Sequence, residues 1–124
     1  MIELNPQYES IFDPRNIDDD CDKIARLMSI EAQTIRESLH AGQHKQAITM
    51  YLQLLKAMCT HFVDDEHWCY FDDWYSPDFV MRELYDFIMK HEINADSEAL
   101  LQAGHDEISH TNCYGDYGLP SFIR

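Results

Sequence analysis

Histidine, carboxylate and thiol side chains gather in one short stretch of this sequence, between residues 61 and 69. The four candidate ligands are His61, Asp64, His67 and Cys69. Imidazole, carboxylate and thiolate all bind zinc, and a turn in this stretch would bring three of the four groups around one ion. The stretch therefore predicts a site for zinc or another divalent metal. The alternative interpretation is a helix end, where a histidine caps the negative dipole and the acids are solvated.

Two further histidines belong to Glu-x-x-His patterns, Glu37/His40 and Glu107/His110. Pairs of this pattern form the metal centre of di-iron helical bundles, where the side chains project into the core. Here the apolar periodicity places Glu37 and His40 on the solvent side of their helix, and it leaves His110 outside the apolar stripe of its own. The sequence therefore excludes a di-iron centre of that kind.

Motifs for enzyme catalysis are absent from the sequence. It contains no G-x-S-x-G nucleophile motif, no phosphate-binding glycine loop and no dinucleotide-binding fingerprint. The four cysteines form no C-x-x-C pair, so neither a zinc ribbon nor a thioredoxin-like redox motif is present. These observations favour a function that is not enzymatic.

Aromatic and acidic residues interleave in the segment that follows, and both tryptophans of the chain lie there. If residues 66–75 are helical, the aromatic side chains divide between two faces, of which one enters the core. The second face is covered either by the ends of the chain or by a partner protein, because tryptophan and tyrosine dominate the anchor residues of interfaces. The candidate partner-binding residues are Trp68, Tyr70, Phe71, Asp72, Asp73 and Trp74.

The chain is strongly acidic. Its 124 residues include 9 basic and 23 acidic side chains, which give a formal net charge of −14. Such a chain repels phosphate groups, which argues against direct binding to nucleic acids or to anionic membrane surfaces and favours a basic protein partner. The sequence shows no secretory signal and no apolar run that could span a membrane. We therefore expect a cytoplasmic protein with reduced cysteines.

Four segments have the apolar spacing of helices that bury one face. The first is expected from about residue 19 to His40, and Gly42 is placed to cap its end. The second follows at once and continues to about residue 62. Its apolar stripe is the broadest in the chain, which indicates a helix that faces the core.

The third and fourth helices have start signals in the sequence. Ser76 and the proline that follows it predict the start of a helix over residues 77–91. Asp96 or Ser97 is expected to cap the fourth helix, which carries apolar residues as far as position 108. Gly104 lies inside that helix, so it marks either close packing or an early end.

The fold class that follows is all-α, a small single-domain bundle of about four helices in antiparallel hairpins. Residues 1–17 contain two prolines and predict an irregular arm, with room for one helical turn around Tyr8 to Phe12. Residues 18–112 form the helical core, and residues 113–124 a non-helical tail, because glycine and proline there oppose a helix. Both ends carry apolar side chains and are expected to pack on the bundle.

The start of the second helix resembles the second-helix half of a tetratricopeptide repeat. Gly42, Ala47, Ile48 and Tyr51 have the residue types and the spacing of that family. The preceding helix departs from the family pattern, and no second copy follows, whereas such repeats need about three copies to be stable. We therefore interpret the segment as an ordinary antiparallel helix pair.

The leading functional hypothesis is an adaptor domain that binds a basic protein partner through the aromatic and acidic side chains around Trp68 and Trp74. No cofactor is expected for that function. The alternative hypothesis is a small metal-binding protein or a metal-dependent enzyme, with zinc or another divalent metal at His61, Asp64 and their neighbours.

Overall fold

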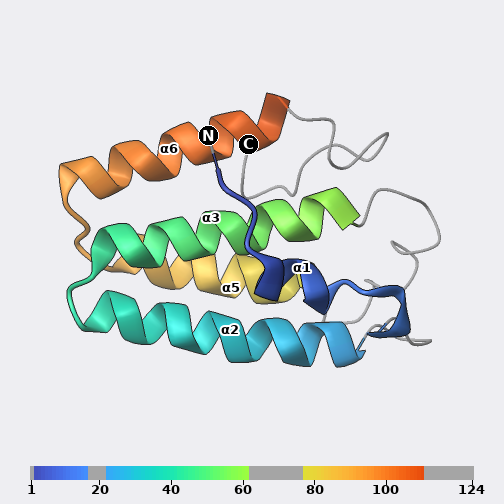
Figure 1. Ribbon diagram of the computed structural model, residues 1–124. Helices are drawn as coiled ribbons and strands as arrows, with labels where there is room; N and C mark the ends of the chain where they lie inside the picture. The colour runs from blue at the N-terminus through green and yellow to red at the C-terminus, as the bar shows by residue number, and fades with distance from the viewer. Residues whose placement is uncertain (1, 17–21, 62–76, 111–124) are drawn as a thin grey trace.

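The computed structural model describes residues 2–16, 22–61 and 77–110, and all regular structure in these ranges is helical (Figure 1). The elements are α1 (Pro6–Ile11), the 3₁₀ turn η1 (Pro14–Asn16), α2 (Asp22–His40), α3 (His44–His61), α5 (Pro77–Lys90) and α6 (Ala95–His110). The predicted all-α bundle is confirmed. None of the described helices has a stretch both long and apolar enough to cross a membrane.

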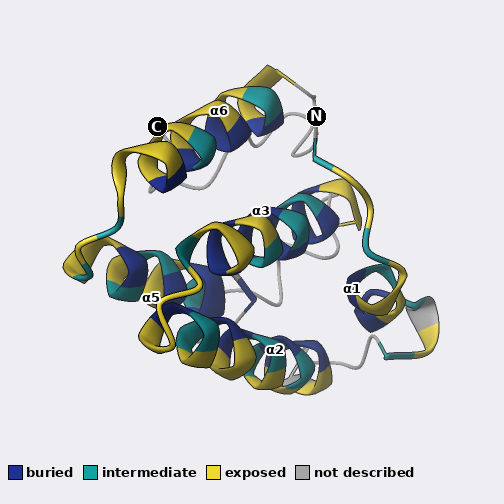
Figure 2. Ribbon diagram, turned by 60° about the vertical axis from the view of Figure 1, so that its left-hand side comes forward, coloured by how far each residue is buried: buried dark blue, intermediate teal, exposed yellow. Residues whose placement is uncertain are grey.

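The four long helices lie side by side along one common direction. α2 and α5 run one way, and α3 and α6 run the opposite way (Figure 1). α3 packs against both α2 and α6, whereas α5 packs mainly against α2 (Figure 2). Short connections after α2 and after α5 produce this arrangement, because a few residues can only join helices that turn back on themselves. α5 also runs in the same direction as α2, so the carboxyl ends of α2 and α5 lie at the same end of the bundle (Figure 1).

The end of α2 is set by the glycine that the sequence marked as its cap. Gly42 has a φ of 81°, a left-handed conformation that other residues adopt at a cost. Its backbone N–H donates to the carbonyl of Leu39 (3.1 Å), and the N–H of Gln43 donates to the carbonyl of Ser38 (3.0 Å). This pair of hydrogen bonds is the Schellman motif, which satisfies the last carbonyls of a helix. The predicted cap is therefore confirmed.

The core is centred on α3, which is covered by α1, α2 and α6 (Figure 2). This central position explains why its apolar stripe is broader than that of the other helices, since a helix covered from several sides needs apolar residues on each of them. Its buried residues are Ala47, Ile48, Tyr51, Leu52, Leu54, Leu55, Ala57, Met58 and Cys59.

The N-terminal arm is more regular than the sequence predicted, since it contains helix α1. The side chain of Asn5 accepts a hydrogen bond from the backbone N–H of Gln7 (3.0 Å) and so caps the helix. Pro6 occupies the first position, where its missing N–H has no helical partner to lose. α1 is too short to be stable alone and is held by packing on α2 and α3, which the local spacing does not reveal. Its buried side chains, together with the C-cap, are Tyr8, Ile11 and Phe12.

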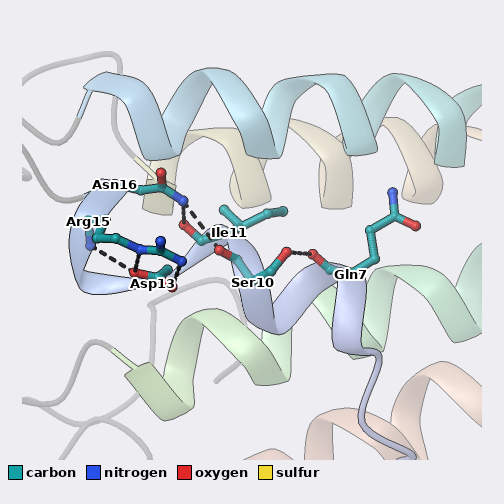
Figure 3. A network of polar contacts seen from close by, with 6 residues as sticks. All are labelled: Gln7, Ser10, Ile11, Asp13, Arg15 and Asn16. Atoms are coloured by element: carbon teal, nitrogen blue, oxygen red, sulfur yellow. Dashed lines mark hydrogen bonds and ion pairs between the residues drawn. The ribbon is translucent and has the colours of Figure 1, made fainter.

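Side-chain hydrogen bonds hold the turn after α1 (Figure 3). Nδ2 of Asn16 donates to the carbonyl oxygens of Ser10 (3.2 Å) and Ile11 (3.0 Å) at the end of the helix, and the Ser10 carbonyl also accepts from the backbone N–H of Asp13 (3.2 Å). The guanidinium of Arg15 donates to both carboxylate oxygens of Asp13 (3.1 and 2.9 Å). These hydrogen bonds lower the pKa of Asp13 to about 2. The arm therefore ends in a defined turn.

A carboxylate on α6 binds the first residues of the arm. Both oxygens of Glu107 accept hydrogen bonds from the backbone N–H of Ile2 (3.0 Å each). Nζ of Lys56, on α3, donates to Glu107 (3.2 Å) and to the carbonyl of Ile2 (3.3 Å). The hydrogen bond from the Ile2 N–H is the main reason why the pKa of Glu107 lies below its usual range. The arm thereby links α3 to α6.

Substitution Glu107→Ala is expected to loosen the arm without unfolding the bundle. The loss of these hydrogen bonds should lower the free energy of unfolding by about 1 kcal/mol, because the groups are partly exposed. Trypsin should cleave the variant faster after the exposed Arg15, as followed by mass spectrometry under native conditions. Glu98→Ala, which removes an exposed acid from the same helix, is the matched control. Equal cleavage rates in the two variants would show that Glu107 does not hold the arm.

Candidate functional site

Most of the sequence-predicted site residues lie outside the described part of the chain. The partner-binding set is Trp68, Tyr70, Phe71, Asp72, Asp73 and Trp74, and the metal set includes Asp64, His67 and Cys69; all of these belong to residues 62–76. Both sites therefore remain predictions.

His61 is the one member of the metal set that the structure describes. Its Nε2 lies 2.6 Å from a carboxylate oxygen of Glu9, and its ring stacks on Phe12 with ring centres 5.6 Å apart and planes 8° from parallel. His61 thus helps to fasten the arm to the end of α3. Within the described ranges, no group of three or more histidine, cysteine, aspartate or glutamate side chains is placed to hold a metal ion.

A surface depression lies at the corner where α5 turns into α6. It has a volume of about 450 Å³. Among the apolar lining residues, Ile88 is fully buried, Met89 keeps half of its surface exposed (50%) and Ile93 is half-buried. The lining acids Glu92 and Glu98 are both exposed. The complete lining is Ile88, Met89, His91, Glu92, Ile93 and Glu98.

The short connection between α5 and α6 positions these residues. Oδ1 of Asn94 accepts a hydrogen bond from the backbone N–H of Ser97 (2.8 Å), so Asn94 caps α6. The sequence analysis expected Asp96 or Ser97 in this role, which is wrong. The helix begins earlier than expected, and Ser97 is instead buried in its first turn (1% exposed). The early start brings Glu98 to the depression.

The depression combines an apolar surface with negative charge. Three acids and one lysine lie between residues 89 and 98. An apolar side chain placed over Met89 and Ile93 would lose contact with water, while a lysine or arginine beside it would meet Glu92 and Glu98. These are the properties of a surface that binds an apolar side chain flanked by positive charge.

A second hollow, of about 250 Å³, lies between α3 and α6 beside the N-terminal arm. The backbone of α6 comes close to α3 here, because a Cβ atom on Gly104 would overlap the two terminal methyl groups of Leu52. Of the two alternatives that the sequence left open for Gly104, close packing is confirmed, and the helix continues to His110. The lining residues with carboxylate groups are Glu3 and Glu107, and Glu107 is already bound to the arm.

A buried polar pair lies between α3 and α6. The hydroxyl of Tyr51 and Nε2 of His105 share a hydrogen bond of 2.7 Å, and the ring of Tyr85 lies 5.4 Å from that of His105. Burial lowers the pKa of His105 to about 4 and raises that of Tyr51. His105 is only 6% exposed, so a substrate would not reach it, and we assign the pair a structural role.

The depression was not predicted from the sequence, although one signal for it was present. Met89 falls outside the apolar stripe of α5, and acids surround the apolar Ile93. Apolar residues that do not fit a helix stripe and lie among charges are the pattern of a surface anchor.

Comparisons of the chain with protein-family models, with curated proteins and with solved structures find no match. The segment that resembles half of a tetratricopeptide repeat belongs to the α2–α3 hairpin, and α2 and α3 pack directly on each other.

Proposed function

We propose that this protein is a binding module for a basic protein segment, and that the depression at the α5–α6 corner is the docking surface. The observation that carries the proposal is that the half-exposed Met89 lines the same depression as the exposed acids Glu92 and Glu98. The occupant we propose is an apolar side chain with lysine or arginine on either side of it.

The position of Glu92 supports a role in binding. α5 ends at Lys90, so Glu92 lies just beyond the negative end of a helix dipole, where an acid is unfavourable by up to about 1 kcal/mol. Asp96 and Glu98, by contrast, lie in the first turn of α6, where the dipole stabilises acids. Helix electrostatics therefore account for Asp96 and Glu98 but not for Glu92, whereas attraction of a basic partner accounts for Glu92.

The net charge of −14 supports the same occupant. A strongly negative chain accelerates the approach of a positive partner and repels an acidic one. The aromatic and acidic side chains around Trp68 and Trp74 are a second predicted surface for the same partner. The two surfaces are separable by mutation.

A pair of synthetic peptides tests the proposal. One has leucine on one helical face and lysine on the other, and its counterpart has glutamate in place of lysine. The full chain, with EDTA present, should bind the lysine peptide only, and the methyl signals of Met89 and Ile93 should shift in NMR spectra. Higher salt should weaken the complex, because it screens exposed charges.

Charge reversal identifies the surface. The Glu92→Lys/Glu98→Lys variant should bind the lysine peptide about tenfold more weakly, since two attractive contacts become repulsive. Asp86→Lys/Asp106→Lys changes the net charge equally at exposed acids that do not line the depression, and should have a smaller effect. Equal losses in both variants, or a loss confined to Trp68→Ala/Trp74→Ala, would exclude the depression as the docking surface.

A further inference from the structure

Two histidines that are far apart in the sequence meet at one end of the bundle. His40 is the last residue of α2 and is exposed, and His91 directly follows α5 and is half-buried. Their ring centres lie 5.0 Å apart, with the ring planes at 79° to each other. Because α2 and α5 run in the same direction, their carboxyl ends bring the two side chains together (Figure 1).

The ring of His91 is held in one orientation. Its Nδ1 lies 3.1 Å from the backbone carbonyl oxygen of Phe87. A carbonyl only accepts hydrogen bonds, so Nδ1 carries the proton, and in the neutral ring Nε2 keeps its lone pair. Metal-binding histidines are typically oriented in this way, by a hydrogen bond from the other ring nitrogen to a carbonyl or carboxylate.

The separation of the two rings matches that of imidazoles that share one ion. With metal–nitrogen bonds of about 2.1 Å and angles near tetrahedral, the ring centres of two such imidazoles lie roughly 5 Å apart. No residue in the described ranges forms a hydrogen bond with a ring nitrogen of His40 or with Nε2 of His91. A metal ion would therefore not have to displace a hydrogen bond among the described residues.

The charges around the pair favour a cation. The negative dipole ends of α2 and α5 both point to this end of the bundle, and each attracts positive charge within about one turn. Glu37 and Glu92, both exposed, are close in the sequence to the two histidines. Two positive side chains belong to the same region: the guanidinium of Arg36, whose Cζ lies over the ring of Phe87, 5.6 Å from its centre, and the exposed Lys90, which precedes His91 in the sequence.

We propose that His40 and His91 form a surface site for a divalent transition-metal ion of the kind that imidazole binds, such as Ni²⁺, Cu²⁺ or Zn²⁺. Two protein ligands leave the remaining coordination positions to water, so the ion is exchangeable. This site is separate from the predicted cluster at His61, Asp64, His67 and Cys69. It also does not depend on the proposed binding of a basic segment, although His91 lines that depression.

Calorimetric titration with NiCl₂ tests the site. Ni²⁺ is the probe because it competes less than Zn²⁺ for thiolates and does not oxidise them. The full chain, without an affinity tag and stripped with EDTA, should bind one Ni²⁺ at this site. His40→Ala and His91→Ala should each weaken binding at least about tenfold, and the double variant should add little, because each change removes one of the two ligands of the same ion.

His110→Ala and His61→Ala are the controls. His110 is an exposed histidine at the opposite end of the bundle, and neither change should alter the affinity (Figure 1). Melting temperatures recorded without metal show whether each variant is folded. In the unsubstituted chain, substoichiometric Ni²⁺ should broaden the NMR signals of His91 and Phe87 first. The proposal is overturned if the double variant binds as the parent does, if His61→Ala alone removes binding, or if other signals broaden first.

Discussion

Acidification from pH 7 to about pH 4 is expected to remove about 3 kcal/mol of stability through His105 alone. Burial lowers the pKa of this histidine from 6.5 to about 4 in the folded protein. The unfolded chain therefore takes up a proton at a higher pH than the folded chain does. The stabilising contribution is complete above about pH 6.5 and is lost as the pH falls from there through about 4.

The surroundings of His105 explain the size of the effect. Its ring packs against those of Tyr51 and Tyr85, with ring centres 5.6 and 5.4 Å away, and the two tyrosine rings also contact each other. Tyr51 shares a hydrogen bond of 2.7 Å with Nε2 but brings no compensating negative charge, because burial also raises its own pKa. A protonated His105 would therefore be a buried charge without an ion-pair partner in this cluster.

A double substitution distinguishes the contribution of His105 to the pH dependence of stability from that of the many carboxylates that titrate in the same pH range. Tyr51→Phe/His105→Phe replaces both partners of the hydrogen bond with apolar rings. This costs less stability than a single substitution that leaves one buried polar group without a partner. Urea unfolding at both pH values should show a pH dependence smaller by about 3 kcal/mol in this variant. At pH 7 the single variant His105→Phe should be less stable than the double variant, because it leaves the Tyr51 hydroxyl without its hydrogen-bond partner. An unchanged pH dependence in the double variant would mean that His105 does not titrate between these limits.

Substitution Gly104→Leu is expected to destabilise the bundle by about 2 kcal/mol. A Cβ atom at this position would overlap the terminal methyl groups of Leu52 and lie 2.9 Å from its Cγ. Leu52 is only 2% exposed, so its methyl groups must turn into the adjoining hollow of about 250 Å³, which both residues line, or α6 must move away from α3. The better helix propensity of leucine offsets only about 1 kcal/mol of this loss. Thermal and urea unfolding, monitored by circular dichroism, measure the change.

Two further variants test whether the loss of stability comes from the overlap with Leu52. Gln102→Leu adds a similar side chain at an exposed position of α6 and should change stability by less than about 0.5 kcal/mol. Gly104→Ala should cost about 1 kcal/mol in the parent chain and less in a Leu52→Ala background, where the overlapping methyl groups are gone. If the cost of Gly104→Ala is the same in both backgrounds, the close packing of α6 on α3 is not its origin.

The helices could be predicted from the sequence because their signals are local. Apolar residues at threes and fours identified α2, α3, α5 and α6, and Gly42 marked the end of α2 through its tolerance of a left-handed backbone. Even the packing role of Gly104 was one of two stated alternatives, since a glycine inside a helix is unfavourable unless something requires it. α1 was anticipated only as a helical turn around Tyr8 to Phe12, because the helix is short, and the Asn94 cap escaped prediction, because a competing cap signal followed it.

The depression at the α5–α6 corner and the His40/His91 pair could not be predicted from the residue spacing along any one helix. The acidic composition predicted a basic partner, but the depression exists because the α5–α6 turn places Met89, Glu92 and Glu98 around one hollow. His40 was predicted on the solvent side of its helix, and it is exposed there, yet nothing local pairs it with His91. Periodicity reports which face of a helix is buried. Only packing decides which helices become neighbours, and the parallel course of α2 and α5 brought these two histidines together.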